Sequence, residues 1–182
     1  MSTKKDYLIK ALHVVSWILF VGLCIQAGGF IFNAVFTLLL NPEGASKFWL
    51  EVDLSEVYNY NQSYFVVLTS LMIITTVMKA FMFYRIVKVF HDKKFNFSQP
   101  FNEALRRLIL SIAYLALGIG LFSFWGTKFH KYLVKQGLKM PDIQNLSLNG
   151  ADVWLFMSII LLVIALIFKK GIEIQNENDL TV

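Results

Sequence analysis

The sequence predicts an all-α integral membrane protein, a four-transmembrane-helix bundle with short external strand-like segments that form a small cap. Hydrophobic residues make up 57% of the 182 residues and charged residues only 16%, whereas a soluble domain has about 25% charged residues. The apolar residues are also gathered into four runs, each near the roughly 20 residues that cross a bilayer. These runs are Ala11 to Leu40, Gln62 to Tyr84, Leu108 to Thr127 and Asp152 to Phe168, and together they predict a single membrane domain over residues 1–182.

The first run, residues 11–40, is predicted to be a retained helix and not a cleaved signal peptide, because it is longer than the ~7–15 apolar residues of a signal sequence. At about 1.5 Å per residue it would be about 45 Å long. Such a helix either protrudes from the bilayer or bends at Gly28-Gly29. We expect a continuous or mildly bent helix that ends at Asn41-Pro42, because Pro42 and Gly44 are stop signals.

Two external segments, residues 41–61 and 128–151, connect the spans outside. Each contains a stretch of alternating apolar and polar residues, 50–55 in the first and 143–148 in the second, which is typical of a short strand. One interpretation is a two-fold internal repeat whose strands pair into a cap. The other, which we prefer for the repeat, is a chance similarity between two apolar hairpins.

The cytoplasmic side is predicted to hold both termini, a loop of residues 85–107 and a tail of residues 169–182. With this orientation eleven Lys or Arg residues lie inside and five outside, as the positive-inside rule requires. The four lysines of the second external segment weaken the prediction, but the reverse orientation would place the six basic residues of the 85–107 loop outside. The helix after this loop is expected to begin near Pro100, because proline is favoured at a first helical position.

Two cytoplasmic segments resemble a known family. Ile167 to Val182 resembles the closing motif of the bacterial membrane family catalogued as domain-of-unknown-function 2975, in which the last helix leaves the membrane through a basic pair and a glycine and ends in a Gln/Glu-rich stretch. Phe97 to Asn102, followed by Arg106-Arg107, resembles the family's cytoplasmic Pro-Phe turn.

The family has no established activity, but its members are often encoded beside a short helix-turn-helix regulator of the Cro/C1 type. The resemblance therefore implies a protein of the bacterial cytoplasmic (inner) membrane that holds, or senses for, a transcription factor. Its partner-binding candidates lie in the turn and the tail: Phe97, Pro100, Phe101, Glu173, Glu177, Asp179 and Leu180.

Polar residues inside the spans are the other candidates. Lys79 is the one charge well inside a span, and burying a charge at mid-bilayer costs at least ~2.5–3.5 kcal/mol. Because Lys79 lies five residues before Tyr84, we expect it to snorkel to the cytoplasmic headgroups; the alternative is pairing with a carboxylate or a ligand. Polar groups of this kind usually join helices, and they can also line a pocket. The intramembrane candidates are Lys79, Gln26, Asn33, Thr75 and His13.

No catalytic or metal-binding motif is present in the sequence, so we expect a non-enzymatic protein without cofactor or metal. The single cysteine, Cys24, excludes an intrachain disulfide, and the four tryptophans are expected at lipid and interfacial positions. Membrane lipid is an expected contact, direct nucleic-acid binding is not expected, and the oligomeric state is not encoded in any pattern. The first functional hypothesis is a membrane sensor that acts on a helix-turn-helix regulator. The second is a small transporter or lipid-binding protein with a polar cavity.

Overall fold

The protein is an all-α multi-pass membrane protein built from four long helices. The computed structural model describes the backbone of residues 2–50, 52–91 and 101–179, and the side chains of residues 7–50, 52–91 and 101–177. All four long helices are long and apolar enough to cross a membrane. They are α1 (Ser2–Leu39), α3 (Gln62–His91), α4 (Glu103–Lys135) and α5 (Ala151–Asp179); the short helices are η1 (Pro42–Lys47) and α2 (Ser55–Tyr60).

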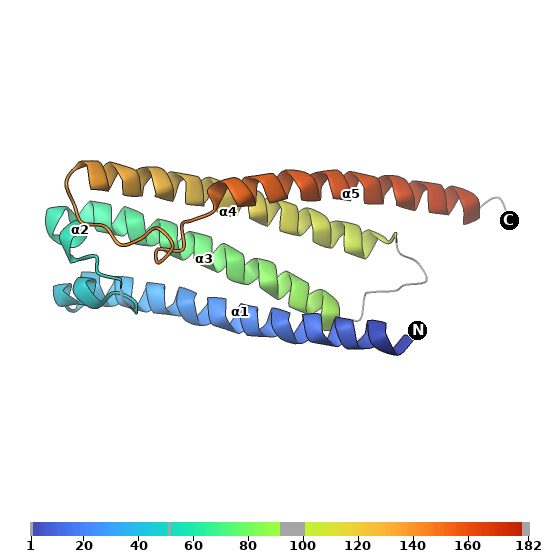
Figure 1. The fold of residues 1–182 in the computed structure, drawn as a ribbon, viewed down its shortest axis with the longest axis horizontal. Coiled ribbons are helices and arrows are strands. Elements are labelled where there is room, and N and C mark those ends of the chain that lie inside the picture. Colours follow the sequence, from blue (N-terminus) through green and yellow to red (C-terminus); the bar gives the residue numbers. More distant parts are fainter. Residues whose placement is uncertain (1, 51, 92–100, 180–182) are drawn as a thin grey trace.

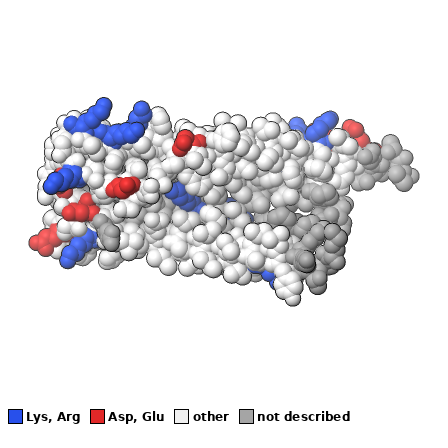
Figure 2. Space-filling view, in the orientation of Figure 1, with Lys and Arg blue, Asp and Glu red and all other residues white. Residues whose placement is uncertain are grey.

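The long helices pack in the order α1, α3, α4, α5, so that α1 and α5 form the two ends of the row. Both chain termini lie at one end of the molecule, which we call the terminal end (Figure 1). η1 and α2 lie at the opposite end, the cap end, and we call residues 40–61 the cap. Charged side chains gather toward both ends of the face drawn in Figure 2, and most of its middle is uncharged. This distribution suits a protein whose middle faces lipid.

Helix α1 is continuous to Leu39, as the sequence predicts, and the chain then enters η1 with Asn41 as its N-cap. The Asn41 side chain accepts a hydrogen bond from the Glu43 N–H at 2.9 Å. The adjacent glycines do not interrupt the helix. Gly29 has a packing role instead, because a Cβ atom there would overlap the Trp49 ring. Trp49 is therefore a half-buried cap residue packed on α1.

The described parts of both connecting segments contain turns and helices and no paired strands. In the first segment the Phe48 N–H donates to the Val52 carbonyl at 3.1 Å, and the Val52 N–H donates to the Trp49 carbonyl at 2.9 Å. Residues 142–148 also coil, and the Ser147 N–H donates to the Gln144 carbonyl at 3.0 Å. These local bonds occupy the backbone groups that strand pairing would need. The predicted strand-like cap is therefore wrong, although a cap is present.

The hydrophobic core lies at the cap end, where α1, the cap, α3 and the segment after α4 meet. Phe30, Phe48 and Phe65 are fully buried, and the Phe48 and Phe65 rings meet edge to face with centroids 5.8 Å apart. Leu146 and Leu148 close the same cluster. Within the chain between α4 and α5, residues 146–148 are thus buried in the core.

Helix α4 begins at Glu103, three residues later than the proline suggested. Asn102 is its N-cap, and its side-chain oxygen accepts from the Leu105 N–H at 2.8 Å. Asparagine is among the best N-cap residues because its side chain satisfies a free helix N–H. Glu103 then pairs with Arg106 and Arg107 at 2.9 and 3.3 Å. Capping by Asn102 sets the helix start, and Pro100 lies outside the described residues.

Candidate functional site

Helix α5 begins about midway along the molecule, because the chain after α4 first runs back along the bundle (Figure 1). We call residues 142–150 the return segment. The Thr127 hydroxyl on α4 donates to the Leu148 carbonyl at 3.1 Å, and Gly126 leaves room for the Leu148 side chain. The return segment therefore lies beside residues that the sequence places within the third apolar run, and it brings backbone polar groups into an apolar layer.

Side chains from α1 and α3 both donate hydrogen bonds to Ser147 of the return segment. Gln26 on α1 donates its side-chain N–H to the Ser147 hydroxyl oxygen at 2.9 Å. Lys79 on α3 donates from Nζ to the Ser147 carbonyl oxygen at 2.8 Å. Ser147 is buried and has a φ of +59°, a left-handed conformation that is uncommon outside glycine. We call Gln26, Lys79 and Ser147 the polar node.

Lys79 lies in the middle of α3, about 18 Å of helix axis from His91 and about 25 Å from Gln62. Its Nζ also lies 5.8 Å from the centre of the Trp154 ring on α5, a cation–π distance. The expectation that Lys79 snorkels toward the cytoplasmic headgroups is wrong. Side chains on a helix lean toward its N-terminus, and in α3 that direction leads to the cap end and the return segment.

The other three intramembrane candidates form hydrogen bonds within their own helices and none with Ser147. Asn33 donates to the Gly29 carbonyl at 2.8 Å in its own helix. Thr75 is buried and donates to the Leu71 carbonyl at 2.9 Å, also in its own helix. His13 lies toward the terminal end, where its Nε2 accepts from the Trp17 indole N–H at 3.1 Å. Only Gln26 and Lys79 therefore converge on one place.

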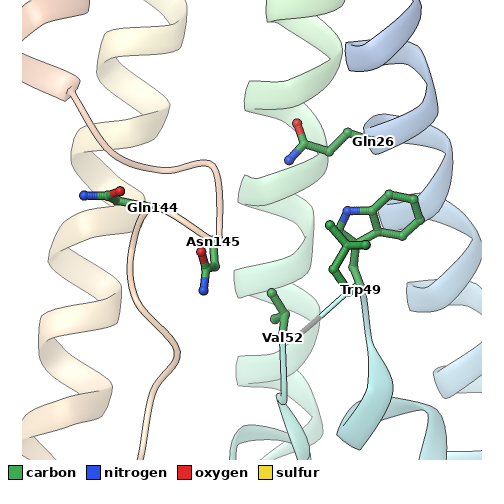
Figure 3. Close-up of a pocket in the computed structure, with 6 residues that line it drawn as sticks. Gln26, Trp49, Val52, Gln144 and Asn145 are labelled. Carbon is green, nitrogen blue, oxygen red and sulfur yellow. The ribbon is translucent and has the colours of Figure 1, made fainter.

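Two cavities flank the polar node. The first, of about 460 Å³, lies on its cap side, where Gln26 extends from α1 toward the segment that carries Asn145 and Trp49 faces the same space (Figure 3). The second, of about 400 Å³, lies between α1 and α5 and contains Lys79. Its apolar lining comes from three helices: Leu19 and Leu23 on α1, Phe83 on α3, and Val153, Trp154 and Met157 on α5. We call it the α1–α5 cavity.

The described part of the chain brings no three His, Cys, Asp or Glu side chains together in a metal-binding group. The family model described as "Protein of unknown function (DUF2975)" matches residues 49–182, more than half of the sequence. The chain belongs to this family. No curated protein and no solved structure matches it. The matched part of this DUF2975 member contains Lys79, Ser147 and Trp154, and Gln26 precedes it.

At the terminal end of this DUF2975 member, the start of α4 packs on α5. The Phe101 and Phe168 rings meet with centroids 5.3 Å apart, and a Cβ atom at Gly171 would overlap the Phe101 ring. Glu173 pairs with Lys170 at 3.2 Å on the exposed surface of α5. Phe101 therefore connects α4 with the region of α5 where the tail begins.

The remaining partner-binding candidates are only partly described. Glu177 is exposed on α5, and Asp179 ends that helix without a described side chain. Phe97, Pro100 and Leu180 lie outside the described residues.

Sequence reasoning missed Ser147 and Trp154, which complete the surroundings of Lys79. The sequence predicts Ser147 as one residue of an external strand and Trp154 as a residue at a lipid or interfacial position. A signal was available in Leu146 and Leu148, since two leucines in an otherwise polar loop indicate burial. Buried leucines would have placed Ser147 between them near the core.

Proposed function

We propose that this protein is a non-enzymatic membrane sensor in which a ligand at the polar node changes how α5 is held against the rest of the bundle. The supporting observation is the double use of Ser147, whose hydroxyl binds Gln26 of α1 and whose carbonyl binds Lys79 of α3. Ser147 lies four residues before α5 begins. A ligand that takes either hydrogen bond from Ser147 loosens the segment that leads into α5.

Helix α5 is suited to carry such a change to the terminal end. It is one helix from Ala151 to Asp179, so a shift at its first turn moves the whole element. At its far end Phe168 and Gly171 contact Phe101, which precedes α4. The loop of residues 85–107 and the tail therefore respond to the same movement.

The proposed partner is a small helix-turn-helix regulator, bound in the cytoplasm by the turn before α4 and by the tail of α5. The charge distribution of the sequence supports cytoplasmic termini, and membership of the DUF2975 family supports a bacterial inner membrane. The described surface here carries both signs, with Arg106, Arg107 and Lys170 beside Glu103 and Glu173. Such a surface favours a specific polar interface over nonspecific attraction to nucleic acid.

A pull-down from native membranes in mild detergent tests the partner. The full chain, a chain ending at Gln175 and a Phe101→Ala variant are compared by mass spectrometry of the bound proteins. The proposal expects a small helix-turn-helix protein with the full chain, its loss with the truncation, and a reduced yield with Phe101→Ala. Phe156→Ala is the matched control, because Phe156 is an exposed phenylalanine near the start of α5, at the other end of that helix from the tail. The same proteins bound by all four chains would contradict the proposal.

A small transporter is the second candidate, and the two cavities on either side of the polar node favour it. In that mechanism the return segment is the barrier between the cap-side cavity and the α1–α5 cavity. Gln26→Ala, which removes the hydrogen bond from α1 to the return segment, would then increase solute flux in proteoliposomes. The sensor mechanism expects no flux in either the unchanged chain or the variant.

A further inference from the structure

We infer that the α1–α5 cavity binds a single-chain amphiphile with a carboxylate head, of the fatty-acid type, with the carboxylate at Lys79 and the acyl chain directed toward the terminal end. This inference deepens the proposed function by naming its ligand class, and it rests on that proposal only for its signalling consequence. Binding itself follows from the shape, charge and depth of the cavity.

The shape of the cavity separates a charged end from an apolar channel. Lys79 lies at its cap-side end, and Phe83 lies one helical turn further toward the terminal end on the same helix. On α1, Leu19 follows Leu23 by one turn in the same direction, and on α5 Met157 follows Val153. The lining therefore continues as apolar surface from Lys79 toward the terminal end, which suits an extended acyl chain.

The charge of the cavity requires an anion. Lys79 is the charged residue of its lining, and its ammonium pairs with no described carboxylate. Of the three ammonium N–H groups, one donates to the Ser147 carbonyl and the others can donate to a ligand. The first turn of α5, at Gly150 to Trp154, adds the positive end of a helix dipole at the same end of the cavity. Asp152, the acidic residue of that turn, is exposed and does not line the cavity.

The depth of Lys79 selects a fatty acid over a phospholipid. About 9 Å of helix axis separates Lys79 from Arg85, the next basic residue on α3, and the Lys79 side chain extends further away from it. A phospholipid phosphate stays at the interface because it remains charged. A carboxylic acid can enter the apolar layer in its neutral form and ionise beside an ammonium. Leu19, Val153 and Met157 are partly exposed at the rim, so entry is from the lipid side.

Photolabelling tests the inference on the full chain in phosphatidylcholine nanodiscs. The probe is palmitic acid with a diazirine near the end of its chain, and the labelled peptides are identified by mass spectrometry. We expect labels on the α1, α3 and α5 peptides that contain Leu19, Phe83 and Met157, and displacement of the probe by unlabelled palmitate. The corresponding palmityl alcohol probe, which lacks the charge, is expected to label these peptides weakly.

Matched variants show whether Lys79 holds the head. Lys79→Met is expected to lower the labelling affinity by about tenfold or more, the change that loss of one charge-assisted hydrogen bond produces, and Lys79→Arg is expected to retain it. Lys128→Met is the control, because Lys128 also lies over an aromatic ring, at 5.3 Å from the Phe124 centre, but outside the cavity. A second variant, Leu19→Trp, keeps Lys79 but fills the α1–α5 cavity, so it should block labelling. It tests the site independently if Lys79→Met does not fold.

Three results would overturn the inference. They are equal labelling by the acid and the alcohol, labelling of Leu19→Trp at the level of the unchanged chain, and loss of labelling when phosphatidylglycerol replaces phosphatidylcholine, which would assign the site to a phospholipid. The ligand and the partner are separable. Labelling without a captured regulator would contradict the sensor proposal alone, and a captured regulator without labelling would contradict the ligand class alone.

Discussion

The cap half and the terminal half of the molecule are packed very differently. In the cap half, Phe30, Phe48 and Phe65 come from three separate segments and are fully buried in one aromatic cluster. The two outer helices of the row bury few residues: only 6% of the residues in the most apolar window of α1 and 11% in that of α5 are buried. In the terminal half, ring contacts such as Phe101 on Phe168 join the elements. The large, fully buried aromatic rings are therefore gathered at the cap end of the molecule.

The polar node lies where these two halves meet, the position that the proposed sensor mechanism requires. On its cap side Leu146 and Leu148 anchor the return segment in the core. On its other side the α1–α5 cavity separates the two outer helices of the row. In the proposed sensor mechanism, the cap would resist a change at Ser147 and α5 would transmit it to the terminal half.

The largest expected effect comes from removing a ring of the cap core. Phe65→Ala should lower the free energy of unfolding by about 3–5 kcal/mol, because Phe65 is fully buried and its loss leaves a cavity. Phe156→Ala, which removes a 66% exposed ring on α5, should change it by less than about 0.5 kcal/mol. Unfolding of both variants in mixed detergent micelles, followed by circular dichroism, gives the comparison. Equal losses would show that the cap is not the stable core.

The adjacent glycines of α1 give the second test. Gly29→Ala should cost about 1–3 kcal/mol, because its Cβ overlaps the ring of Trp49, which the cap holds in place. Gly28→Ala meets no atom within 4 Å and should stabilise the helix by up to about 1 kcal/mol through helix propensity. The same unfolding assay measures both. A stable Gly29→Ala variant would mean that the Trp49 ring moves freely, and the distinction between the halves would fail.

The third test concerns Ser147 at the junction. Ser147→Ala removes the hydroxyl that Gln26 binds and should cost about 0.6 kcal/mol, the average for such bonds in membranes. Ser147→Gly removes the same hydroxyl but suits a φ of +59°, so it should be about 1 kcal/mol more stable than the alanine variant. Adding Gln26→Leu to either variant should cause no further loss of stability through this hydrogen bond, because the Ser147 hydroxyl is already absent. Equal stability of the alanine and glycine variants would show that the positive φ at residue 147 costs the alanine variant no measurable stability.

The fold was largely predictable from the sequence, whereas the site was only partly so. Four apolar runs specify four helices because each must satisfy its backbone within the bilayer, and the motif ending in Leu180-Thr181-Val182 pointed to the correct family. Lys79 and Gln26 were found because polar residues stand out in apolar runs. Their common partner was missed because the bond to Ser147 depends on the direction of the Lys79 side chain and on the path of residues 142–150. The spacing of apolar and polar residues along the sequence predicts neither this direction nor this path.

The smallest expected effect is at Gly171, and it tests the terminal half directly. A Cβ atom at Gly171 would overlap the Phe101 ring, much as one at Gly29 would overlap the Trp49 ring. Phe101 is 36% exposed, however, and the ring that it contacts among the described residues is that of Phe168, so we expect it to rotate away. Gly171→Ala should therefore change the free energy of unfolding by less than about 0.5 kcal/mol, against about 1–3 kcal/mol for Gly29→Ala. A cost at Gly171 as large as that at Gly29 would mean that the start of α4 is fixed to α5 rigidly, and a shift of α5 would then have to move α4 as a body instead of releasing Phe101.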